Sequence, residues 1–283
     1  MWDTVKMAKQ ELVVKSNHLI EASYQLTLNE QRVILLAITK IHRQKPLSSD
    51  DIFTIHAEDF STYFDMDVNN TYQELIKVAE RLYERTLIIN QPDPDFPKLT
   101  KTKTRWISSI DYIPESGTLR LMFAQKIVPY LSMLKEQFTK YPLGAVSKMS
   151  SIYAIRLYEL LKQWSVLGIR EVNLEWLKQQ LEIDTEYQRM FDFKKYVIEP
   201  AMTQINAHSD LQVSYTQRKT GREVTHFTFI FSPKVVVETK ASKKKKDTGE
   251  RILGILKADI ERLAKAGESY EQAAERIKTM GLV

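Results

Sequence analysis

The chain of 283 residues contains no cysteine. It therefore forms no disulfide and no thiol-ligated zinc site, and its composition suits the reducing cytoplasm. No apolar run approaches the roughly 18 residues that a membrane-spanning helix requires. The opening residues MWDTVKMAKQ lack the apolar segment and cleavage site of a secretory signal. We therefore expect a cytoplasmic protein without a membrane partner.

Motifs for common catalytic chemistry are also missing. The eight glycines include no G-x-x-x-x-G-K-[ST] loop, so no ATP-phosphate cradle is predicted. The five histidines are scattered and form no His-x-His pair: His18, His42, His56, His208 and His226. None of the 13 tyrosines has a neighbouring metal cluster or activating base in the sequence, and Tyr153, Tyr158 and Tyr187 are interpreted as packed aromatics. We expect no catalytic residue, no metal site and no cofactor.

What the chain does contain is clustered positive charge. It is 43% hydrophobic and 27% charged, which is typical of a globular protein, and its length predicts two domains. The net charge is +5. The basic segments are KLTKTKTR (98–105), QRKTGR (217–222) and KASKKKK (240–246), while residues 48–67 are acidic. Such runs also occur on solvated surfaces, but their clustering favours a polyanionic partner.

The first half of the chain predicts a defined order of elements. Thr27 and Glu30 have the spacing of a helix-capping box. Hydrophobic periodicity and turn residues predict a helix over 17–41, a strand over 52–56, a short helix over 57–64, a turn over 65–70, a longer helix over 71–86, and strands over 87–90, 105–113 and 118–124.

The second half repeats this order. The expected elements are a helix over 150–164, a strand over 170–176 running into a helix over 174–181, a turn over 182–190, a long helix over 192–207, and hairpin strands over 211–217 and 225–232. Each half is thus a helix, strand, short helix, turn and longer helix, followed by a β-hairpin with a basic loop. We predict an α+β protein with two tandem winged helix-turn-helix domains related by pseudo-symmetry, residues 11–140 and 141–236. Residues 237–283 are expected to form a basic linker and an amphipathic helix with Ile252, Leu256, Ile260 and Leu263 on one face.

This order of elements favours DNA binding. The second helix of a helix-turn-helix presents its N-terminal residues to the major groove, and a hairpin wing places cations on nearby phosphates. Lys194 and Lys195 lie about 100° and 200° around the helix from Phe193, so both can face DNA while Phe193 packs inward. Pro200 is expected to kink this helix or to begin its second section.

Four sequence blocks carry a resemblance to a known family. They are LVVKSNHLIEASYQLTLNEQRVILLAI, FTKYPLGAVSKMSSIYAIRLYELLKQW, YQRMFDFKKYVIEPAMTQIN and YTQRKTGREVTHFTFIF. In this order, over residues 11–232, the chain resembles the iteron-binding plasmid replication initiators, the Rep proteins with tandem winged-helix domains. The resemblance implies that the C-terminal domain recognises directly repeated origin sites, and that the N-terminal domain contacts adjacent DNA and mediates dimerisation. It also implies origin opening by monomers, repression of the protein's own promoter by dimers, and recruitment of the host initiator ATPase, helicase and primase.

The resemblance places candidate DNA-binding residues in both domains. In the second domain they are Arg189, Lys194 and Lys195 of the recognition helix, and Arg218, Lys219 and Arg222 of the wing. In the first domain they are Asn69, Asn70, Thr71 and Tyr72 at the start of the recognition helix, and Lys101, Lys103 and Arg105 near the wing.

Two other functions remain open at this point. One is a tyrosine-dependent enzyme that nicks origin DNA, and the other is a dedicated transcriptional repressor built from the same domains. The segment 242–283 lies outside the resemblance, and it is interpreted as a DNA-contacting tail, a partner-docking helix or a disordered region.

Overall fold

The computed structural model describes most of the chain. The described residues are 11–42, 45–90, 98–183, 185–234, 251–253, 255–257, 260 and 269–279. The chain divides into two compact units, residues 1–234 and 235–283, and each is described by itself.

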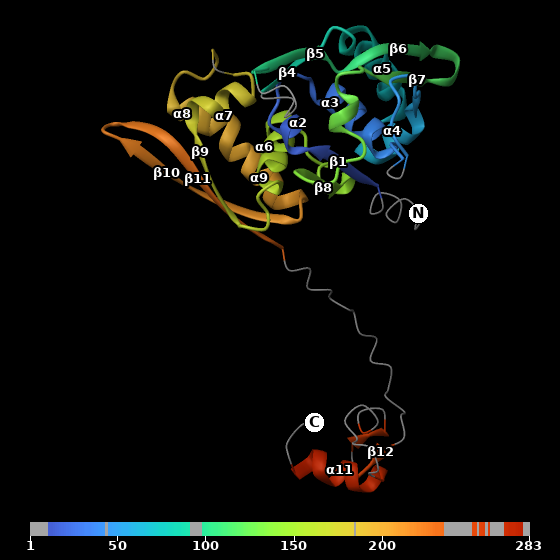
Figure 1. Cartoon of the computed structure of the whole chain (residues 1–283), viewed down its shortest axis with the longest axis vertical. Helices are drawn as coiled ribbons and strands as arrows, with labels where there is room; N and C mark the ends of the chain where they lie inside the picture. Colours follow the sequence, from blue (N-terminus) through green and yellow to red (C-terminus); the bar gives the residue numbers. More distant parts are fainter. Residues whose placement is uncertain are drawn as a thin grey trace. The chain divides into compact units, whose positions relative to one another are not determined.

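The first half of the larger unit contains the predicted elements and several additional ones (Figure 1). Its helices and strands are β1 (Leu12–Ser16), α2 (Asn17–Ile20), β2 (Ser23–Tyr24), α3 (Leu28–Thr39), β3 (Phe53–His56), α4 (Ala57–Phe64), α5 (Val68–Leu82), β4 (Thr86–Asn90), β5 (Lys101–Arg105), β6 (Ile107–Ile113), the 3-10 turn η1 (Pro114–Ser116), β7 (Thr118–Phe123), η2 (Val128–Tyr130), β8 (Phe138–Pro142) and η3 (Leu143–Ala145).

Two predictions for this half were wrong in their extent. The single helix expected over 17–41 is two helices, because the intervening strand β2 pairs with β4. The capping box is present at the start of α3, where Thr27 and Glu30 each accept a backbone N–H of the other. The strand expected over 105–113 is interrupted at Trp106, and its two parts, β5 and β6, belong to different sheets.

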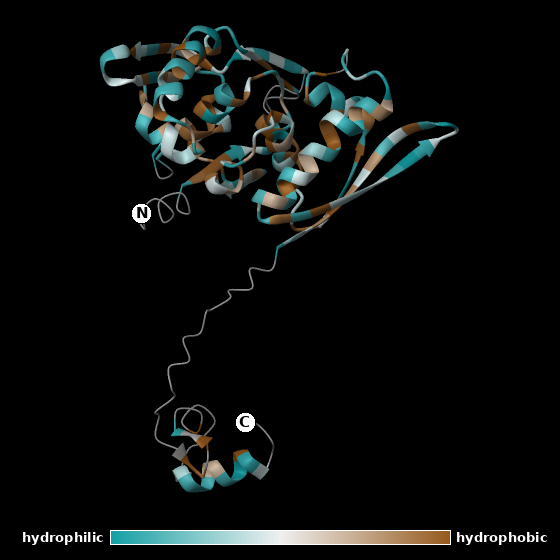
Figure 2. Cartoon of the chain, turned by 180° about the vertical axis from the view of Figure 1, so that it is seen from behind, coloured by the Kyte–Doolittle hydropathy of each residue, from teal (hydrophilic) through white to brown (hydrophobic). Residues whose placement is uncertain are grey.

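The second half follows the predicted order closely. Its elements are α6 (Ile152–Lys162), β9 (Ile169–Asn173), α7 (Leu174–Gln180), α8 (Met190–Phe193), the π-helical turn η4 (Lys194–Ile198), α9 (Glu199–His208), β10 (Leu211–Thr220) and β11 (Glu223–Pro233). The hairpin strands are longer than predicted. Figure 2 shows that β10 becomes hydrophilic toward the hairpin tip.

The two halves share one sheet topology. In the first, β3 pairs with β7, which pairs with β6; in the second, β9 pairs with β11, which pairs with β10. In each sheet one strand precedes a helix pair, α4–α5 or α7–α9, and a hairpin follows it, so the unit contains two winged-helix domains. The first domain carries an additional sheet of order β2-β4-β5, and β1 pairs with β8. Figure 1 shows the β10–β11 hairpin projecting from one end of the unit, with α7 and α8 beside it.

The long helix of the second domain changes its winding before a proline. Residues 190–208 are continuously helical, but the turn η4 is π-helical and α9 begins at Glu199 with Pro200 in its first turn. Proline lacks the N–H that would bond the carbonyl four residues earlier, and its ring collides with that carbonyl. The π turn lies directly before the proline section, and prolines and π turns are both recognised causes of irregular helix geometry. The expectation that Pro200 begins a second helical section is therefore confirmed.

The apolar stripes that periodicity predicted form the core. The inward side chains of the long helix are all buried: Phe193, Val197, Ile198, Ala201, Met202 and Ile205. They belong to one cluster that also contains the apolar residues of α3, α5 and α6. The two winged-helix domains therefore share a continuous core.

A buried charged cluster joins the domains where β1, β8 and α6 meet. The Arg156 guanidinium donates to the carbonyl oxygens of Ile20, Ala22 and Gln180 at 3.1, 2.7 and 3.0 Å. Glu159, one turn further along α6, lies 2.5 Å from the Lys15 ammonium. Arg156 is 2% exposed, so it makes these bonds in a water-free environment where each is hard to replace.

The smaller unit has a core of its own. Strands β12 (Arg251–Ile252) and β13 (Ile255–Leu256) pair antiparallel, and helix α11 runs over Tyr270–Thr279. Its buried cluster consists of Ile255, Ile260, Ala273, Ala274 and Ile277. The prediction that an amphipathic helix starts at Ile252 was wrong, because residues 251–252 and 255–256 are paired strands. The basic run 240–246 and Leu263 lie outside the described residues.

Candidate nucleic-acid interface

A groove in the second winged-helix domain collects most of the predicted side chains. It has a volume of about 930 Å³ and lies between α7, the start of the long helix and the β10–β11 hairpin. Its lining includes Lys194, Lys195, Lys219 and Arg222. Arg189 is the N-cap residue of α8, and its side chain is exposed at the same helix start. The structure therefore brings five of the six candidates of this domain to one end of the domain.

The two lysines of the helix are oriented differently. The Lys194 ammonium donates to the Gln217 side-chain oxygen at 3.3 Å and lies 5.8 Å from the Tyr215 ring, so it faces the hairpin. The Lys195 ammonium lies 4.9 Å from the Tyr196 ring and 5.9 Å from the Phe191 ring. Within the described part of the chain, neither lysine pairs with a carboxylate. Their charges are available to an external anion.

Arg218, the sixth candidate, already has a partner. Its Nη2 and Nε atoms donate to the two carboxylate oxygens of Glu171 at 2.8 and 3.2 Å. This hydrogen bond lowers the pKa of Glu171 and raises that of Arg218. The pair is about half exposed, and exposed pairs contribute little to stability. A phosphate that bound Arg218 would have to compete with Glu171, so Lys219 and Arg222 are the freer cations of the wing.

The tip of the β10–β11 wing is an exposed turn with a β-bulge beside it. The strand register shifts between Arg218 and Lys219, which is a β-bulge, and Gly221 has a φ of +63° with no atom within 4 Å of an added Cβ. The bulge increases the local twist of the hairpin. Lys219 and Arg222, on either side of the turn, are both exposed.

Sequence reasoning missed several residues of the groove. Lys178 on α7 is 6% exposed and lies 5.6 Å from the Phe193 ring. Glu175, Glu199 and Glu223 also line the groove, so its charge is mixed. Phe191 is 72% exposed there. The signal for Phe191 was its place two residues before Phe193, because the two rings point away from each other on a helix.

The start of the first domain's recognition helix is less accessible than predicted. Helix α5 begins at Val68, with the Asp67 side chain accepting the Asn70 N–H at 3.1 Å. Asn69 and Asn70 are exposed. Thr71 is 0% exposed and its hydroxyl donates to the Asp67 carbonyl at 2.8 Å. The prediction that Thr71 faces the groove is therefore corrected, because Thr71 lies four residues before the buried Leu75 and so shares the core-facing side of α5.

Tyr72 is held by the hairpin of its own domain. Its ring packs so closely over Gly117 that a Cβ added there would lie 1.8 Å from the Tyr72 Cε1 atom. The ring is partly buried against the core. Tyr72 therefore has a packing role in this structure, and Asn69 and Asn70 are the accessible candidates.

The basic residues of the first domain do not lie on its wing. The β6–β7 hairpin closes through the turn Pro114–Ser116 and Gly117, which contains Glu115 and no cation. This corrects the expectation of a basic wing loop in both domains. Lys101 and Lys103 are exposed on β5, in the additional sheet with β4 and β2.

Arg105, also on β5, is engaged within its own domain. It pairs with Glu84 at 2.9 Å, donates to the Tyr83 carbonyl at 3.0 Å and lies 4.4 Å from the Tyr83 ring. Lys101 and Lys103 are consequently the freer cations of this strand. The predicted loop 91–98 lies outside the described residues except for Lys98, which is exposed.

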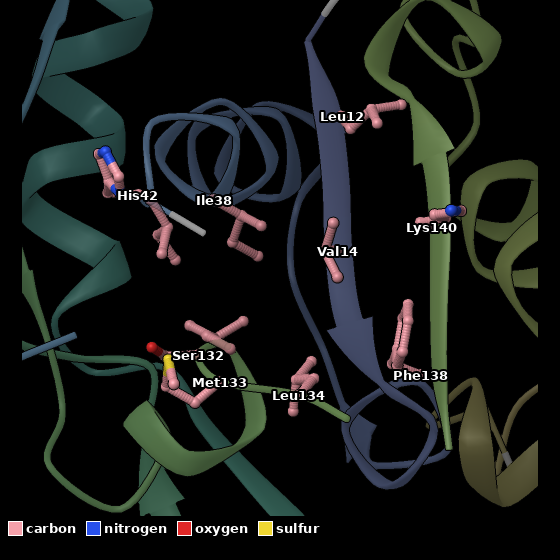
Figure 3. Close-up of a pocket in the computed structure, with 11 residues that line it drawn as sticks. Leu12, Val14, Ile38, His42, Ser132, Met133, Leu134, Phe138 and Lys140 are labelled. Atoms are coloured by element: carbon pink, nitrogen blue, oxygen red, sulfur yellow. The ribbon is translucent and has the colours of Figure 1, made fainter. Parts of the chain in front are cut away.

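A second cavity, lined by both apolar and polar residues, lies in the first domain. It has a volume of about 230 Å³ and is bounded by β1, β8, the end of α3 and the segment 131–134 (Figure 3). Leu12 and Val14 of β1 and Phe138 of β8 line it, with Met133 and Lys140. Met133 is 54% exposed. This face thus presents apolar surface to solvent.

Two other kinds of site are not found among the described residues. No helix in the described ranges has the length and apolar character needed to cross a bilayer. Over the same residues, no group of three His, Asp or Glu side chains is placed to hold a metal ion.

Comparison with known proteins decides the family. Residues 12–162 match the family described as Initiator Replication protein, WH1, and residues 173–231 match Initiator Rep protein, WH2. The chain belongs to the plasmid replication initiator (Rep) family. The resemblance and the tandem winged-helix architecture predicted from the sequence are confirmed.

Relatives of this initiator occur in Escherichia coli. The chain is 26% identical to the PI protein over 276 residues, covering 84% of this chain and 87% of that protein. It is 27% identical to a replication initiation protein over 218 residues, covering 74% and 66% of the two chains. It is also 24% identical to an uncharacterized 27.6 kDa protein over 238 residues, covering 80% and 96%.

A solved structure shares the initiator's fold. The crystal structure of the Pi initiator protein in complex with iteron DNA superposes with a TM-score of 0.69 at 24% identity, covering 80% of this chain and 98% of that one. The likeness shows that the two chains share the tandem winged-helix fold.

Proposed function

We propose that this initiator binds directly repeated duplex sites, iterons, at a plasmid origin and helps to open the origin. The observation that carries the proposal is the groove of the second domain. It presents Lys194, Lys195, Lys219 and Arg222 between a helix start and a hairpin, in a chain of the replication initiator family. The crystallised relative with iteron DNA supports the choice of ligand.

The side chains of this groove fit the two kinds of contact that DNA offers. Exposed lysines and arginines neutralise phosphates and release counterions, so the affinity falls steeply with salt, by about 0.9 in the log–log slope per phosphate neutralised. The start of a recognition helix contacts base edges. The carboxylates of Glu175, Glu199 and Glu223 fit base reading better than phosphate binding, since a carboxylate accepts from the cytosine amine.

The first domain has a supporting role in this proposal. Asn69 and Asn70 are exposed at the start of α5, and amide side chains form hydrogen bonds to bases or phosphates. Lys101 and Lys103 add phosphate contacts. We place the domain limits at residues 11–140 and 141–236, with residues 237–283 appended.

Dimerisation through the first domain is part of the same proposal. The exposed apolar side chains of Phe138 and Met133, which line the cavity beside β1 and β8, support a self-association surface there (Figure 3). Dimers would repress the initiator's own promoter, while monomers would bind iterons and recruit the host initiator ATPase, helicase and primase. Analytical ultracentrifugation of Phe138→Asp tests this surface: the variant should be monomeric where the wild-type chain dimerises, and an unchanged association would exclude the surface.

DNA binding is tested by selecting duplexes from a random library with the full chain. We expect one consensus sequence, with a Kd that rises steeply with KCl. The absence of any selected consensus would contradict the proposal.

Replication and catalysis are tested in separate assays. A plasmid that carries several copies of the consensus beside an A·T-rich segment should replicate when the initiator is supplied in trans. Repression without replication would identify a dedicated repressor. Nicked circles or a covalent tyrosine–DNA adduct, formed with supercoiled plasmid and Mg²⁺, would identify a nicking enzyme and contradict the non-catalytic function proposed here.

A further inference from the structure

Phe191 occupies an unusual position for an aromatic side chain. It lies in the first turn of the long helix and is 72% exposed, whereas Phe193, two residues later, is 0% exposed. A single exposed apolar residue is normal on a protein surface. Its location matters more, because Phe191 lines the groove together with Lys194 and Lys195.

The surroundings of Phe191 combine cations with a small apolar surface. The Lys195 ammonium lies 5.9 Å from the Phe191 ring, on the residue one helical turn further along. Met190 and Val224 are half-buried members of the same groove lining, and Leu174 is 7% exposed. Phe191 is thus the most exposed apolar side chain in a groove whose other accessible groups are charged or polar.

The chemistry of duplex DNA offers one partner for such a ring. In the major groove the bases present hydrogen-bond donors, acceptors and a single apolar group, the C5-methyl of thymine. Residues at the start of a recognition helix are those that contact base edges. We infer that Phe191 contacts a thymine C5-methyl in the bound site and so determines the sequence specificity of the initiator. The inference rests on the proposed function of this groove.

The neighbouring cations could not provide this discrimination. Lys194 and Lys195 are point charges that favour phosphates or guanine acceptors, and neither distinguishes a methyl group from a hydrogen. A ring packed on a methyl excludes water from both surfaces. Burial of one such carbon is worth about a fourfold change in affinity.

The experiment removes the methyl groups one at a time. The duplex is the consensus that the wild-type full chain selects from a random library, and each thymine is replaced singly by uracil, which differs only in lacking the C5-methyl. We expect at least one replacement to weaken wild-type binding about fourfold. Phe191→Ala should bind the parent duplex more weakly and should bind the parent and that uracil duplex equally.

Controls separate a local effect from a general one. Tyr196→Ala removes a second ring of the same helix, 52% exposed and outside the groove lining, and should keep the wild-type uracil effect. Phe191→Leu retains an apolar side chain and should keep part of the affinity loss that the uracil replacement causes in the wild type. Because Phe191 is exposed, we expect its variants to fold, and thermal unfolding by circular dichroism verifies this.

The outcomes distinguish this inference from the proposed function. If the wild-type chain selects a consensus but no uracil replacement weakens it, or if Phe191→Ala shows the same uracil loss as the wild type, the inference is overturned and the proposed function stands. If the wild-type chain selects no consensus, both are overturned.

Discussion

The two winged-helix domains share one strand order and differ in the surfaces that it presents. In the first, the recognition helix presents Asn69 and Asn70 in its first turn, and the wing closes in a short turn with Glu115. In the second, the helix start and the wing tip present lysines and arginines around a groove of about 930 Å³. The repeated topology places a helix start beside a hairpin in both domains, and only the side chains decide how strongly that place attracts DNA.

This difference predicts a division of the binding free energy. Cations that neutralise phosphates contribute a salt-dependent part, while amide hydrogen bonds contribute a part that depends little on salt. Most of the salt dependence of DNA affinity should therefore come from the second domain. Four experiments test this division and the packing on which it depends.

The largest effect is expected at the contact that joins the domains. Arg156→Ala leaves three buried carbonyl oxygens without their hydrogen-bond donor. It also removes a positive charge 3.9 Å from the buried Glu159 carboxylate. Breaking a buried charged cluster in this way should lower the free energy of unfolding by about 3–5 kcal/mol. Urea denaturation followed by circular dichroism measures it. The exposed Arg189→Ala serves as the matched control, and equal stability of the two variants would show that Arg156 does not hold the domains together.

The two wings should respond differently to the same substitution. Gly117→Ala places a Cβ inside the Tyr72 ring at a φ of +54°, so strain and overpacking should together lower the free energy of unfolding by about 2–4 kcal/mol. Gly221→Ala has a similar φ of +63° but open space, so only the strain remains, about 1 kcal/mol. Thermal denaturation of both variants gives the comparison. A loss at Gly221 as large as that at Gly117 would contradict the packing role of Tyr72.

Removing the helix cations of the second domain should weaken DNA binding and its salt dependence together. For Lys194→Ala/Lys195→Ala we expect about 10- to 100-fold lower affinity for the selected duplex at 0.15 M KCl, and a log–log salt slope smaller by about two. Fluorescence anisotropy over a KCl series measures both. Lys40→Ala/Lys45→Ala, which removes two exposed cations of the first domain away from the recognition helices, is the control with the same charge change. An equal loss in the control would mean that net charge alone drives binding.

The smallest effect, on DNA affinity, is expected from substitutions in the recognition helix of the first domain. Asn69→Ala/Asn70→Ala should reduce affinity about fivefold, within the range of one or two lost hydrogen bonds, and should leave the salt slope unchanged. The helix cap should persist, because Asp67 accepts the backbone N–H of Asn70 rather than its side chain. The same anisotropy series tests this pair. A reduced salt slope would contradict the assignment of phosphate neutralisation to lysines and arginines alone.

Local sequence signals predicted most of the helices and strands. The features that these signals missed depend on contacts between residues far apart in the sequence. Helix α4 has the predicted limits, residues 57–64, because periodicity and the following turn act within a few residues. The Arg218–Glu171 pair joins side chains 47 positions apart, and no local sequence pattern predicts it. The extra strand β2 likewise depends on its pairing with β4, more than 60 residues away.

Helical periodicity decided which predicted residues of the first recognition helix are accessible. Thr71 lies four residues before the buried Leu75, on the core-facing side of α5, so its place near the helix start does not expose it. In the second domain periodicity predicted which side of the long helix packs inward, and Lys194 and Lys195 remain accessible. The exposure of Phe191 depends on how α7 and the hairpin pack around it, which periodicity does not describe.

The most direct test of the difference between the domains uses the absence of cysteine. A single introduced cysteine, Glu186→Cys near the second recognition helix or Val68→Cys at the first, carries an iron chelate that cleaves nearby DNA, because no other thiol reacts. With the selected duplex, we predict that the chelate at residue 186 cleaves within the most strongly selected bases, and that the chelate at residue 68 cleaves the adjacent, weakly selected segment. Cleavage of the strongly selected bases from residue 68, with little or none from residue 186, would contradict the account.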